Sequence, residues 1–319
     1  SRGLGDVYKR QVQALFACLM LFAGDYLFYH GYGSATGTFA NRNQLAGFLV
    51  LNLSIGIGLL LAGMREEGSS TWRERIRNLS STLLSQKVRL RIYLVVMVIT
   101  LVLTRSRMGN IAFFVSMTMT GFLAVWLMRQ SSRPIIILLT SLIIIDIFII
   151  SRWFGLEELQ YRFKEMTSQT VSLDVTKTHN LDRIQTSLYA MDLHADARLT
   201  GTGAGTFYTI FPRYQGGNQP LYFQHAHNDV MEFLTDTGWI GLLLLGSIVI
   251  LSLKTSIQAM RKRHHPLMRG MAFSATMGIL ALTIHSTADF NLRIPANVSL
   301  FMVILALAFI SSSMPMKRR

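Results

Sequence analysis

Long hydrophobic runs, separated by short polar segments, make up most of the chain. A helix that crosses a bilayer needs roughly 17–25 mostly apolar residues, and several runs approach or reach that length. They lie at residues 12–29, 44–63, 92–104, 110–128, 134–151, 238–253, 270–287 and 297–314. Because half of the residues are also hydrophobic, the pattern predicts an all-α, polytopic integral membrane protein with about eight transmembrane helices.

These runs divide the chain into regions. Residues 12–151 hold five of the predicted helices, residues 152–237 form one large polar loop, and residues 238–319 hold three more helices and a tail. Residues 1–11 do not begin with methionine. We interpret them as a fragment end or a sequencing scar, exclude them from fold reasoning, and expect that membrane helices upstream are missing.

The distribution of positive charge predicts the orientation in the membrane. In a soluble protein the net charge of +14 would indicate a nucleic-acid partner, but here the basic residues lie mostly in short loops, so we expect none. Both chain ends and the loops on their side carry 20 Lys and Arg residues, against four in the short loops opposite. Basic loops stay in the cytoplasm, so the loop at 152–237 is predicted to face outward, into the periplasm of a Gram-negative cell.

A dense polar cluster stands immediately before the run at 238–253, in the sequence LYFQHAHNDVMEFLTDTGWIG (221–241). Its members are His225, His227, Asn228, Asp229, Glu232 and Asp236. If a helix starts near Asn228, the three acids share one face by three- and four-residue spacing. A polar cluster at the mouth of a membrane helix is costly to desolvate and usually marks a functional site.

Three interpretations of this cluster are open from the residues alone. At the positive end of such a helix, the dipole favours a neutral His227 imidazole, which is the form that a general base needs. Alternatively, the cluster is a polar cap that anchors a re-entrant turn. A third interpretation is a metal site with His225, His227 and Asp229 or Glu232 as ligands, although no third histidine is close in sequence.

Four arginines on the predicted outward side are candidates for binding an anion, because arginine suits bidentate contacts with phosphate oxygens. They are Arg105 and Arg107 in the turn 104–109, Arg42 with its neighbours Asn41 and Asn43 in the turn 37–44, and Arg183 on a loop helix predicted to start at Asp182. Each has an alternative role. The first two arginines could extend to lipid headgroups, the asparagines could cap a turn, and Arg183 could form a surface salt bridge.

The glycine-rich stretch GTGAGT (201–206) is not a dinucleotide-binding fingerprint, because its spacing differs and no strand precedes it. We interpret it as a tight turn packed under the site. Asp25, Asp146 and His285 lie in or near membrane helices and would suit the ion path of a transporter. We see no inverted repeat of the transporter kind.

Taken together, these stretches resemble the O-antigen ligase and O-antigen polymerase superfamily of bacterial membrane glycosyltransferases. The main match is His227-Asn228, nine residues, Gly238, two residues and Gly241, which is similar to that family's histidine motif H-N-x9-G-x-x-G. The order of parts is also similar: a G-T-F-x-N-R-N turn, an S-R-x-G turn, an Arg-led loop helix, a G-x-G-x-G-T-F turn, the histidine motif and a late outer loop at 285–297. The resemblance covers about residues 30–310.

The resemblance implies transfer of a glycan from undecaprenyl diphosphate to an acceptor on the outer face of the inner membrane, without a nucleotide sugar, metal or cofactor. The acceptor is lipid A core in a ligase, another lipid-linked repeat unit in a polymerase, and a protein hydroxyl in a protein O-oligosaccharyltransferase. We favour the ligase and keep an ion-coupled transporter as a distant alternative.

Carried over to this sequence, the resemblance assigns diphosphate binding to Arg107 and Arg183, with Arg105 and Arg42 as weaker candidates. It assigns deprotonation or positioning of the acceptor hydroxyl to His227. We expect supporting roles for polar neighbours, namely His225, Asn228, Asp229, Glu232, Asn41 and Asn43.

Overall fold

The computed structural model describes residues 35–63, 86–127, 175–214 and 224–315, together with the single positions 16 and 140. Every regular element within these ranges is a helix, which confirms the prediction of an all-α protein. The chain divides into two compact units, which are described separately. The bundle unit comprises Ser1–Asp146, Leu251–His285 and Pro295–Arg319, and the loop unit comprises Ile147–Ile250 and Ser286–Ile294.

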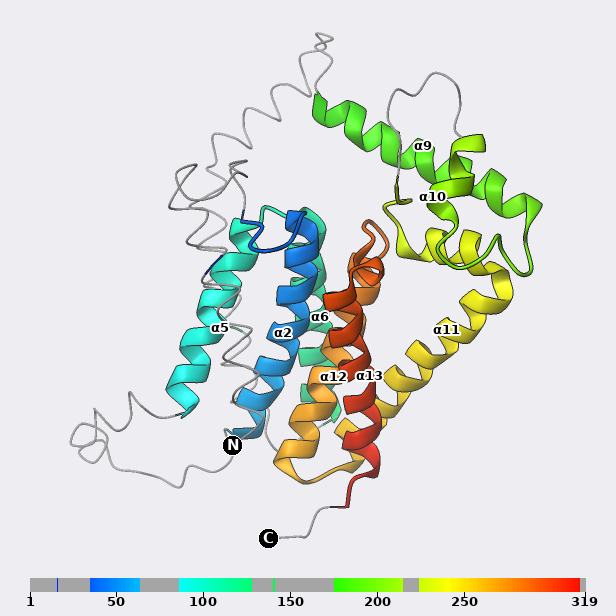
Figure 1. Cartoon of the computed structure of the whole chain (residues 1–319). Coiled ribbons are helices and arrows are strands. Elements are labelled where there is room, and N and C mark those ends of the chain that lie inside the picture. Colours follow the sequence, from blue (N-terminus) through cyan, green and yellow to red (C-terminus); the bar gives the residue numbers. More distant parts are fainter. Residues whose placement is uncertain are drawn as a thin grey trace, which may run out of the picture. The chain divides into compact units, whose positions relative to one another are not determined.

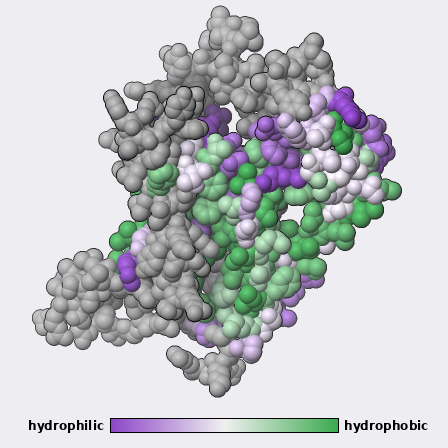
Figure 2. Space-filling view, in the orientation of Figure 1, coloured by the Kyte–Doolittle hydropathy of each residue, from purple (hydrophilic) through white to green (hydrophobic). Residues whose placement is uncertain are grey.

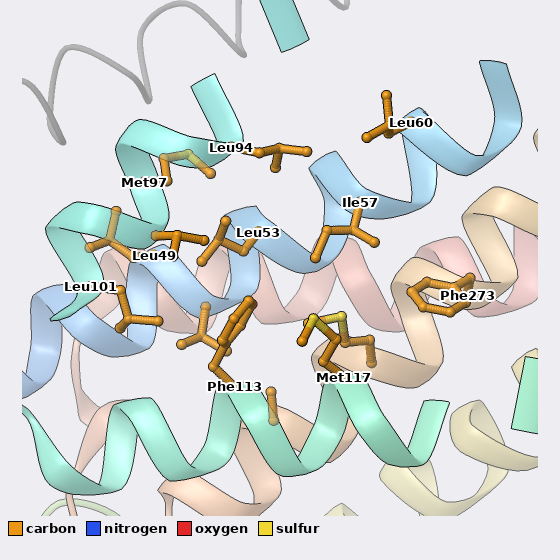
Figure 3. Packing of buried hydrophobic residues seen from close by; sticks show 14 of the residues in the cluster. Leu49, Leu53, Ile57, Leu60, Leu94, Met97, Leu101, Phe113, Met117 and Phe273 are labelled. Atoms are coloured by element: carbon orange, nitrogen blue, oxygen red, sulfur yellow. The ribbon is translucent and has the colours of Figure 1, made fainter. Parts of the chain in front are cut away.

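The bundle unit is built from long helices that pack side by side (Figure 1). They are α2 (Arg42–Gly63), α5 (Gln86–Leu103), α6 (Arg107–Leu127), α12 (Pro266–His285) and α13 (Pro295–Ser313), joined by the C-terminal part of α11 (Asp229–Lys262). Helix α12 is central, because it contacts α2, α6 and α13. The hydrophobic core of this unit includes the buried side chains of Leu53, Leu101, Phe113 and Phe273 (Figure 3).

Helices α2 and α12 approach each other closely at Gly58 and Gly270. A Cβ atom on Gly58 would overlap the Gly270 carbonyl oxygen, and a Cβ atom on Gly270 would overlap the Gly58 carbonyl oxygen. Inside a membrane, lipid tails are as apolar as leucine, so helices associate through close packing of small residues rather than through the hydrophobic effect. The glycine pair therefore sets the separation of the two helices.

One end of the bundle unit brings together the turn before α2, the end of α5 and the starts of α6 and α13. The Ala35 amide donates to the Leu103 carbonyl oxygen at 3.1 Å, and the Asn297 side-chain amide donates to the Gln44 carbonyl oxygen at 3.1 Å. Gly109 of α6 packs against the Ala46 side chain of α2. The turns at 37–44 and 104–109, both predicted to face outward, thus lie at the same end of the unit.

The loop unit contains shorter helices around a small hydrophobic core. Its elements are α9 (Val175–Asp196), α10 (Phe207–Ile210), η3 (Phe211–Arg213), the N-terminal part of α11 and η4 (Asn291–Arg293). The Phe207 and Phe211 rings stack at 4.6 Å within this core. The Tyr214 hydroxyl donates to the Asp196 carboxylate at 2.6 Å, and this hydrogen bond raises the pKa of the Tyr214 phenol.

The start of α9 differs from the prediction. The helix begins at Val175, so Asp182 lies inside it and is not its N-cap. Residues 175–181 include neither glycine nor proline, so nothing in them stops the helix from extending in the N-terminal direction from Asp182.

Among the residues that the structure describes, five helices are long and apolar enough to cross a membrane, namely α2, α6, α11, α12 and α13, and the chain is a multi-pass membrane protein. The predicted spans at 12–29 and 134–151 fall outside the described residues, apart from the isolated positions 16 and 140. The predicted span at 92–104 falls in α5, whose first turns carry three basic residues, and α5 is not one of the five. The number of about eight spans stays a prediction.

The surface pattern agrees with a membrane location. Hydrophobic residues gather over the bundle helices and α11, whereas hydrophilic residues gather around α9 and α10 (Figure 2). In the middle of α11, Leu243, Leu244 and Ile248 are exposed. An apolar outer helix surface of this kind is suited to contact with the hydrocarbon chains of lipid.

Candidate active site

The polar cluster predicted from the sequence is built around the N-terminus of α11, within the loop unit. The helix begins at Asp229, and the Asn228 side-chain oxygen accepts hydrogen bonds from the amides of Val230 (3.0 Å) and Met231 (3.2 Å). This is the geometry of an asparagine N-cap, which satisfies amides that have no partner inside the helix. The prediction that a helix starts near Asn228 is confirmed.

Asp229, Glu232 and Asp236 are all buried on one face of this helix, as predicted. Asp229 binds the segment that follows α12. Its carboxylate accepts from the Ser286 hydroxyl at 2.6 Å and from the Leu292 amide at 3.0 Å. This first acid therefore fixes the loop Ser286–Ile294, which we call the late loop, onto the start of α11.

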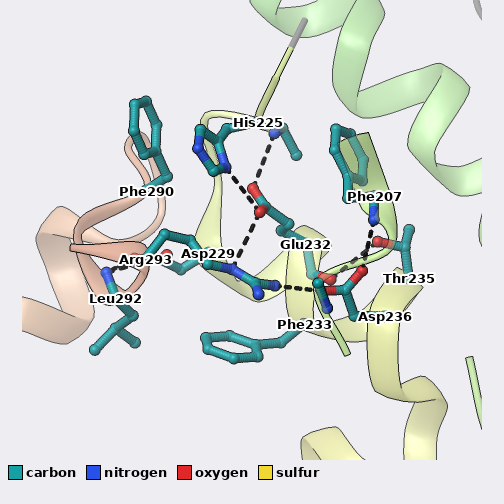
Figure 4. A network of polar contacts seen from close by, with 12 residues as sticks. Phe207, His225, Asp229, Glu232, Phe233, Thr235, Asp236, Phe290, Leu292 and Arg293 are labelled. Carbon is teal, nitrogen blue, oxygen red and sulfur yellow. Dashed lines mark hydrogen bonds and ion pairs between the residues drawn. The ribbon is translucent and has the colours of Figure 1, made fainter. Parts of the chain in front are cut away.

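Arg293 of the late loop lies between the other two acids (Figure 4). Its Nε is 3.1 Å from Glu232 Oε1, and its Nη2 donates to Asp236 Oδ2 at 2.7 Å. Its guanidinium group also lies over the Phe233 ring, 4.6 Å from the ring centre. Buried carboxylates are costly unless they are paired and hydrogen-bonded, so Arg293 is the group that makes two buried acids tolerable here.

The two histidines of the motif meet the same aromatic side chain of the late loop. His225 stacks on Phe290 with ring centres 4.3 Å apart, and the His227 ring stands edge-on to Phe290 at 5.1 Å. His225 Nδ1 also lies 2.9 Å from Glu232 Oε1. His227 has a positive φ of 51°, a strained conformation for a residue other than glycine, and such strain is common at functional sites.

Asp236 connects α11 to the glycine-rich turn at 201–206. Its Oδ2 accepts from the Gly205 amide at 2.8 Å and its Oδ1 accepts from the Phe207 amide at 3.1 Å. Its carbonyl oxygen accepts from the Gly203 amide at 2.8 Å. The stretch is a tight turn with three positive-φ glycines, as predicted, and it packs directly against the helix that carries the acids.

A kink in α11 explains why this turn fits there. Gly238 has φ 61° and ψ −170°, which interrupts the helix. The amides of Trp239 and Ile240 donate instead to the carbonyl oxygens of Arg198 (2.9 Å) and Leu199 (3.1 Å). The first glycine of the G-x-x-G pattern thus marks a break whose free backbone groups are satisfied by the segment leading into the glycine-rich turn.

Three candidate arginines lie in the bundle unit. Arg42 is the first residue of α2, Arg107 is the first residue of α6, and Arg105 has a φ of 53° in the turn before α6. All three side chains are exposed, and their turns lie at the same end of the unit. Arg183, whose backbone belongs to α9, is in the loop unit.

Asn41 and Asn43 also belong to the bundle unit. The Asn41 side-chain oxygen accepts from the Asn43 amide at 2.9 Å, so Asn41 caps the start of α2, which is the alternative role that the sequence left open.

The metal-site interpretation finds no support in the site's geometry. In the part of the chain that the structure describes, no three His, Cys, Asp or Glu side chains are grouped so as to hold a metal ion. Both Glu232 oxygens already face His225, Arg293 or the Ala226 amide. Of the residues considered for an ion path, Asp25 and Asp146 fall outside the described residues, and His285 is buried at the end of α12.

Sequence reasoning found the acids and histidines but missed Arg293, Phe290 and Ser286. A signal for Arg293 was present, because it is one of only four basic residues in the short loops predicted to face outward. No comparable signal marks Phe290 or Ser286.

Residues 92–246 match a family model described as O-antigen ligase. The match covers the α5–α6 turn with Arg105 and Arg107, the loop helix with Arg183, and the whole histidine motif from His227 to Gly241. No curated protein matches the chain. The family match supports membership of the O-antigen ligase superfamily, whose members are glycosyltransferase-type membrane enzymes.

Proposed function

We propose that this protein is a ligase-type enzyme that transfers a glycan from undecaprenyl diphosphate to lipid A core, on the outer face of the inner membrane. The observation that carries the proposal is the O-antigen ligase match over residues 92–246. The network in which His225 and Arg293 contact the buried acids Glu232 and Asp236 supports it, because buried charges at a membrane helix are costly and usually mark a functional site.

Binding of the donor's diphosphate is the role that we assign to the arginines. Negative charge grows on the lipid diphosphate as the glycosidic bond breaks, and fixed guanidinium groups stabilise that charge. Arg42 and Arg107 are exposed at helix N-termini, where backbone amides and the helix dipole also favour anions. Arg105 and Arg183 complete the proposed set. With arginines neutralising the diphosphate, the reaction does not depend on a divalent cation.

Activation or positioning of the acceptor hydroxyl is the role that we assign to the histidine motif. A sugar hydroxyl is a weak nucleophile, so a group that removes or orients its proton accelerates attack by about two to four orders of magnitude. His227 is the motif residue proposed to deprotonate or position this hydroxyl. Its edge-on contact with Phe290 ties it to the late loop, so the loop helps to hold it in place.

Two related reactions are the alternatives. A polymerase of the same superfamily would use a second lipid-linked repeat unit as acceptor, and a protein O-oligosaccharyltransferase would use a Ser or Thr side chain. Both alternatives retain the donor and the roles proposed for the arginines and for His227. The acceptor is therefore the property that an experiment must determine.

The test uses the full-length protein purified in detergent, with undecaprenyl-diphosphate-linked glycan, a chelator, and lipid A core either present or absent. Products are separated on a gel. A single shifted product that appears only with lipid A core supports the ligase. A ladder of products formed without lipid A core would show a polymerase instead. If neither lane contains a product, both the ligase and the polymerase are contradicted, and the protein O-oligosaccharyltransferase and the ion-coupled transporter are the hypotheses that are left.

A further inference from the structure

The late loop and α11 together hold His225 in a fixed orientation, and this arrangement suggests a chemical role for it. We propose that His225 is a second catalytic residue, which takes up the proton of the acceptor hydroxyl while Glu232 acts as its positioning residue. The inference rests on the proposed function and deepens it. It also separates the two histidines, since His227 is then left to position the acceptor.

The first step of the argument is the tautomer of His225. Nδ1 lies 2.9 Å from Oε1 of Glu232, and a carboxylate oxygen can only accept a hydrogen bond. Nδ1 therefore carries the proton, and Nε2 carries the lone pair that can accept one. Within the described residues, the contacts of His225 are those with Glu232 and Phe290. They leave Nε2 without a hydrogen bond, and the side chain is 31% exposed.

The second step is the rigidity of Glu232. Its Oε2 accepts from the Ala226 amide at 3.0 Å, and its Oε1 meets Arg293 Nε at 3.1 Å. With a side chain only 3% exposed, this carboxylate has little freedom to turn away from His225. A buried carboxylate that fixes the tautomer and orientation of a histidine is the arrangement by which a catalytic imidazole is prepared for proton transfer.

The third step is the position of the ring. Phe290 stacks on His225 at 16° between the ring planes and is contacted edge-on by His227. One aromatic side chain thus sets the plane of the proposed proton acceptor and also touches the motif histidine. A single acceptor sugar near Phe290 could meet both imidazoles, one for orientation and one for proton removal.

The reaction balances with these assignments. The acceptor oxygen forms a bond to the anomeric carbon while the bond from that carbon to the diphosphate oxygen breaks. The electron pair of the broken bond leaves with the lipid diphosphate. The hydroxyl proton moves to His225 Nε2 and returns to solvent after the products leave.

The test is chemical rescue with free imidazole, using the full-length protein and undecaprenyl-diphosphate-linked glycan with its acceptor. We expect His225→Ala to lower the initial transfer rate by about 10²–10⁴-fold, and added imidazole to restore a dose-dependent part of it, because the partly exposed site can admit a small base. His227→Ala is the matched comparison and is expected to show no rescue. Rescue reports proton transfer, and a purely structural role of His225 would not produce it.

Two further variants separate orientation from folding. Glu232→Gln keeps a hydrogen-bonding side chain but lacks the fixed acceptor charge, and we expect reduced transfer that imidazole does not restore. His225→Gln retains a donor toward Glu232 but has no basic nitrogen, so it replaces His225→Ala if that variant does not fold. Folding is checked by gel filtration and thermal unfolding in detergent.

The outcomes are distinguishable. A folded His225→Ala or His225→Gln protein with wild-type rates overturns the role of His225 and leaves the proposed function intact. Rescue of His227→Ala instead of His225→Ala also overturns it, because the proton then goes to His227. Absence of transfer by the wild-type protein would overturn the proposed function itself, and this inference with it.

Discussion

Arg293 Nη2 lies 2.7 Å from Asp236 Oδ2, although the two residues are 57 positions apart in the sequence. The same guanidinium group meets Glu232 through Nε. This pairing joins the late loop to α11, and through the contacts of Asp236 with Gly205 and Phe207 it also reaches the glycine-rich turn. Three separate segments of the chain are thus held by one cation and two buried acids.

Removal of Arg293 should destabilise the loop unit. Arg293→Ala leaves the buried carboxylates of Glu232 and Asp236 without the cation that pairs with them, and breaking a buried pair in this way typically costs about 3–5 kcal/mol. We expect a clearly lower unfolding temperature in detergent, with partial recovery in Arg293→Lys, because a lysine cannot match the planar fork of arginine. Arg213→Ala, at an exposed position of the same unit, is the control. Equal melting temperatures for the Arg293→Ala and Arg213→Ala proteins would refute the importance of the pair.

The kink in α11 should not tolerate a side chain. A Cβ atom at Gly238 would overlap the Leu199 carbonyl group, and its φ of 61° is unfavourable for other residues. Gly238→Ala is therefore expected to cost at least the roughly 1–3 kcal/mol of a strained backbone. Gly246→Ala in the same helix meets nothing within 4 Å and should be neutral or stabilising by up to about 1 kcal/mol. Thermal unfolding of both variants tests this contrast, which a similar loss in each would contradict.

Arg107 should require its guanidinium group. Lysine keeps the charge but supplies a point charge instead of a bidentate fork, so Arg107→Lys is expected to lose most transfer activity while folding normally. The control is Arg261→Lys, an exposed arginine near the C-terminal end of α11. Glycan transfer is measured on the gel described above. Wild-type turnover in Arg107→Lys would remove the proposed contact with diphosphate.

His227 should matter for turnover and not for donor binding. We expect His227→Ala to abolish transfer while binding of undecaprenyl-diphosphate-linked glycan, measured by stabilisation against thermal unfolding, stays near the wild-type level. The physical reason is that the donor's charge is assigned to arginines, whereas the histidine acts on the acceptor hydroxyl. If donor binding is lost together with turnover, His227 has a structural or donor-binding role instead.

Much of the fold and part of the site could be predicted from the sequence. The hydrophobic runs correctly predicted α2, α6, α12 and α13, because a membrane helix can be recognised from the length and apolar composition of one segment. The shared face of Asp229, Glu232 and Asp236 followed from helical periodicity, a property of a few adjacent residues. The predicted start of α9 at Asp182 was wrong, since capping residues are a weaker signal than hydrophobic spacing.

The residues missed by sequence reasoning belong to contacts between distant segments. Arg293 was identified only as a charge in an outward loop, yet the structure places it between two buried acids. Gly201 and Gly238 were assigned to separate motifs, yet a Cβ atom on either would overlap backbone atoms near the other. Both contacts join segments that are far apart in the sequence, so no local periodicity of residues predicts them.

The sequence by itself determined that this is a helical membrane protein, which residues form the histidine motif, and which acids share a face of α11. Periodicity and hydrophobicity are patterns of a few neighbouring residues, so they can be recognised within a single segment of the sequence. Only the tertiary structure decided that Arg293 pairs with Glu232 and Asp236, that the carbonyl groups of Arg198 and Leu199 satisfy the amides freed at the Gly238 break, and that Glu232 orients His225. Those pairings depend on how separate segments pack, and the cost of leaving a buried charge or backbone group unsatisfied selects the partner.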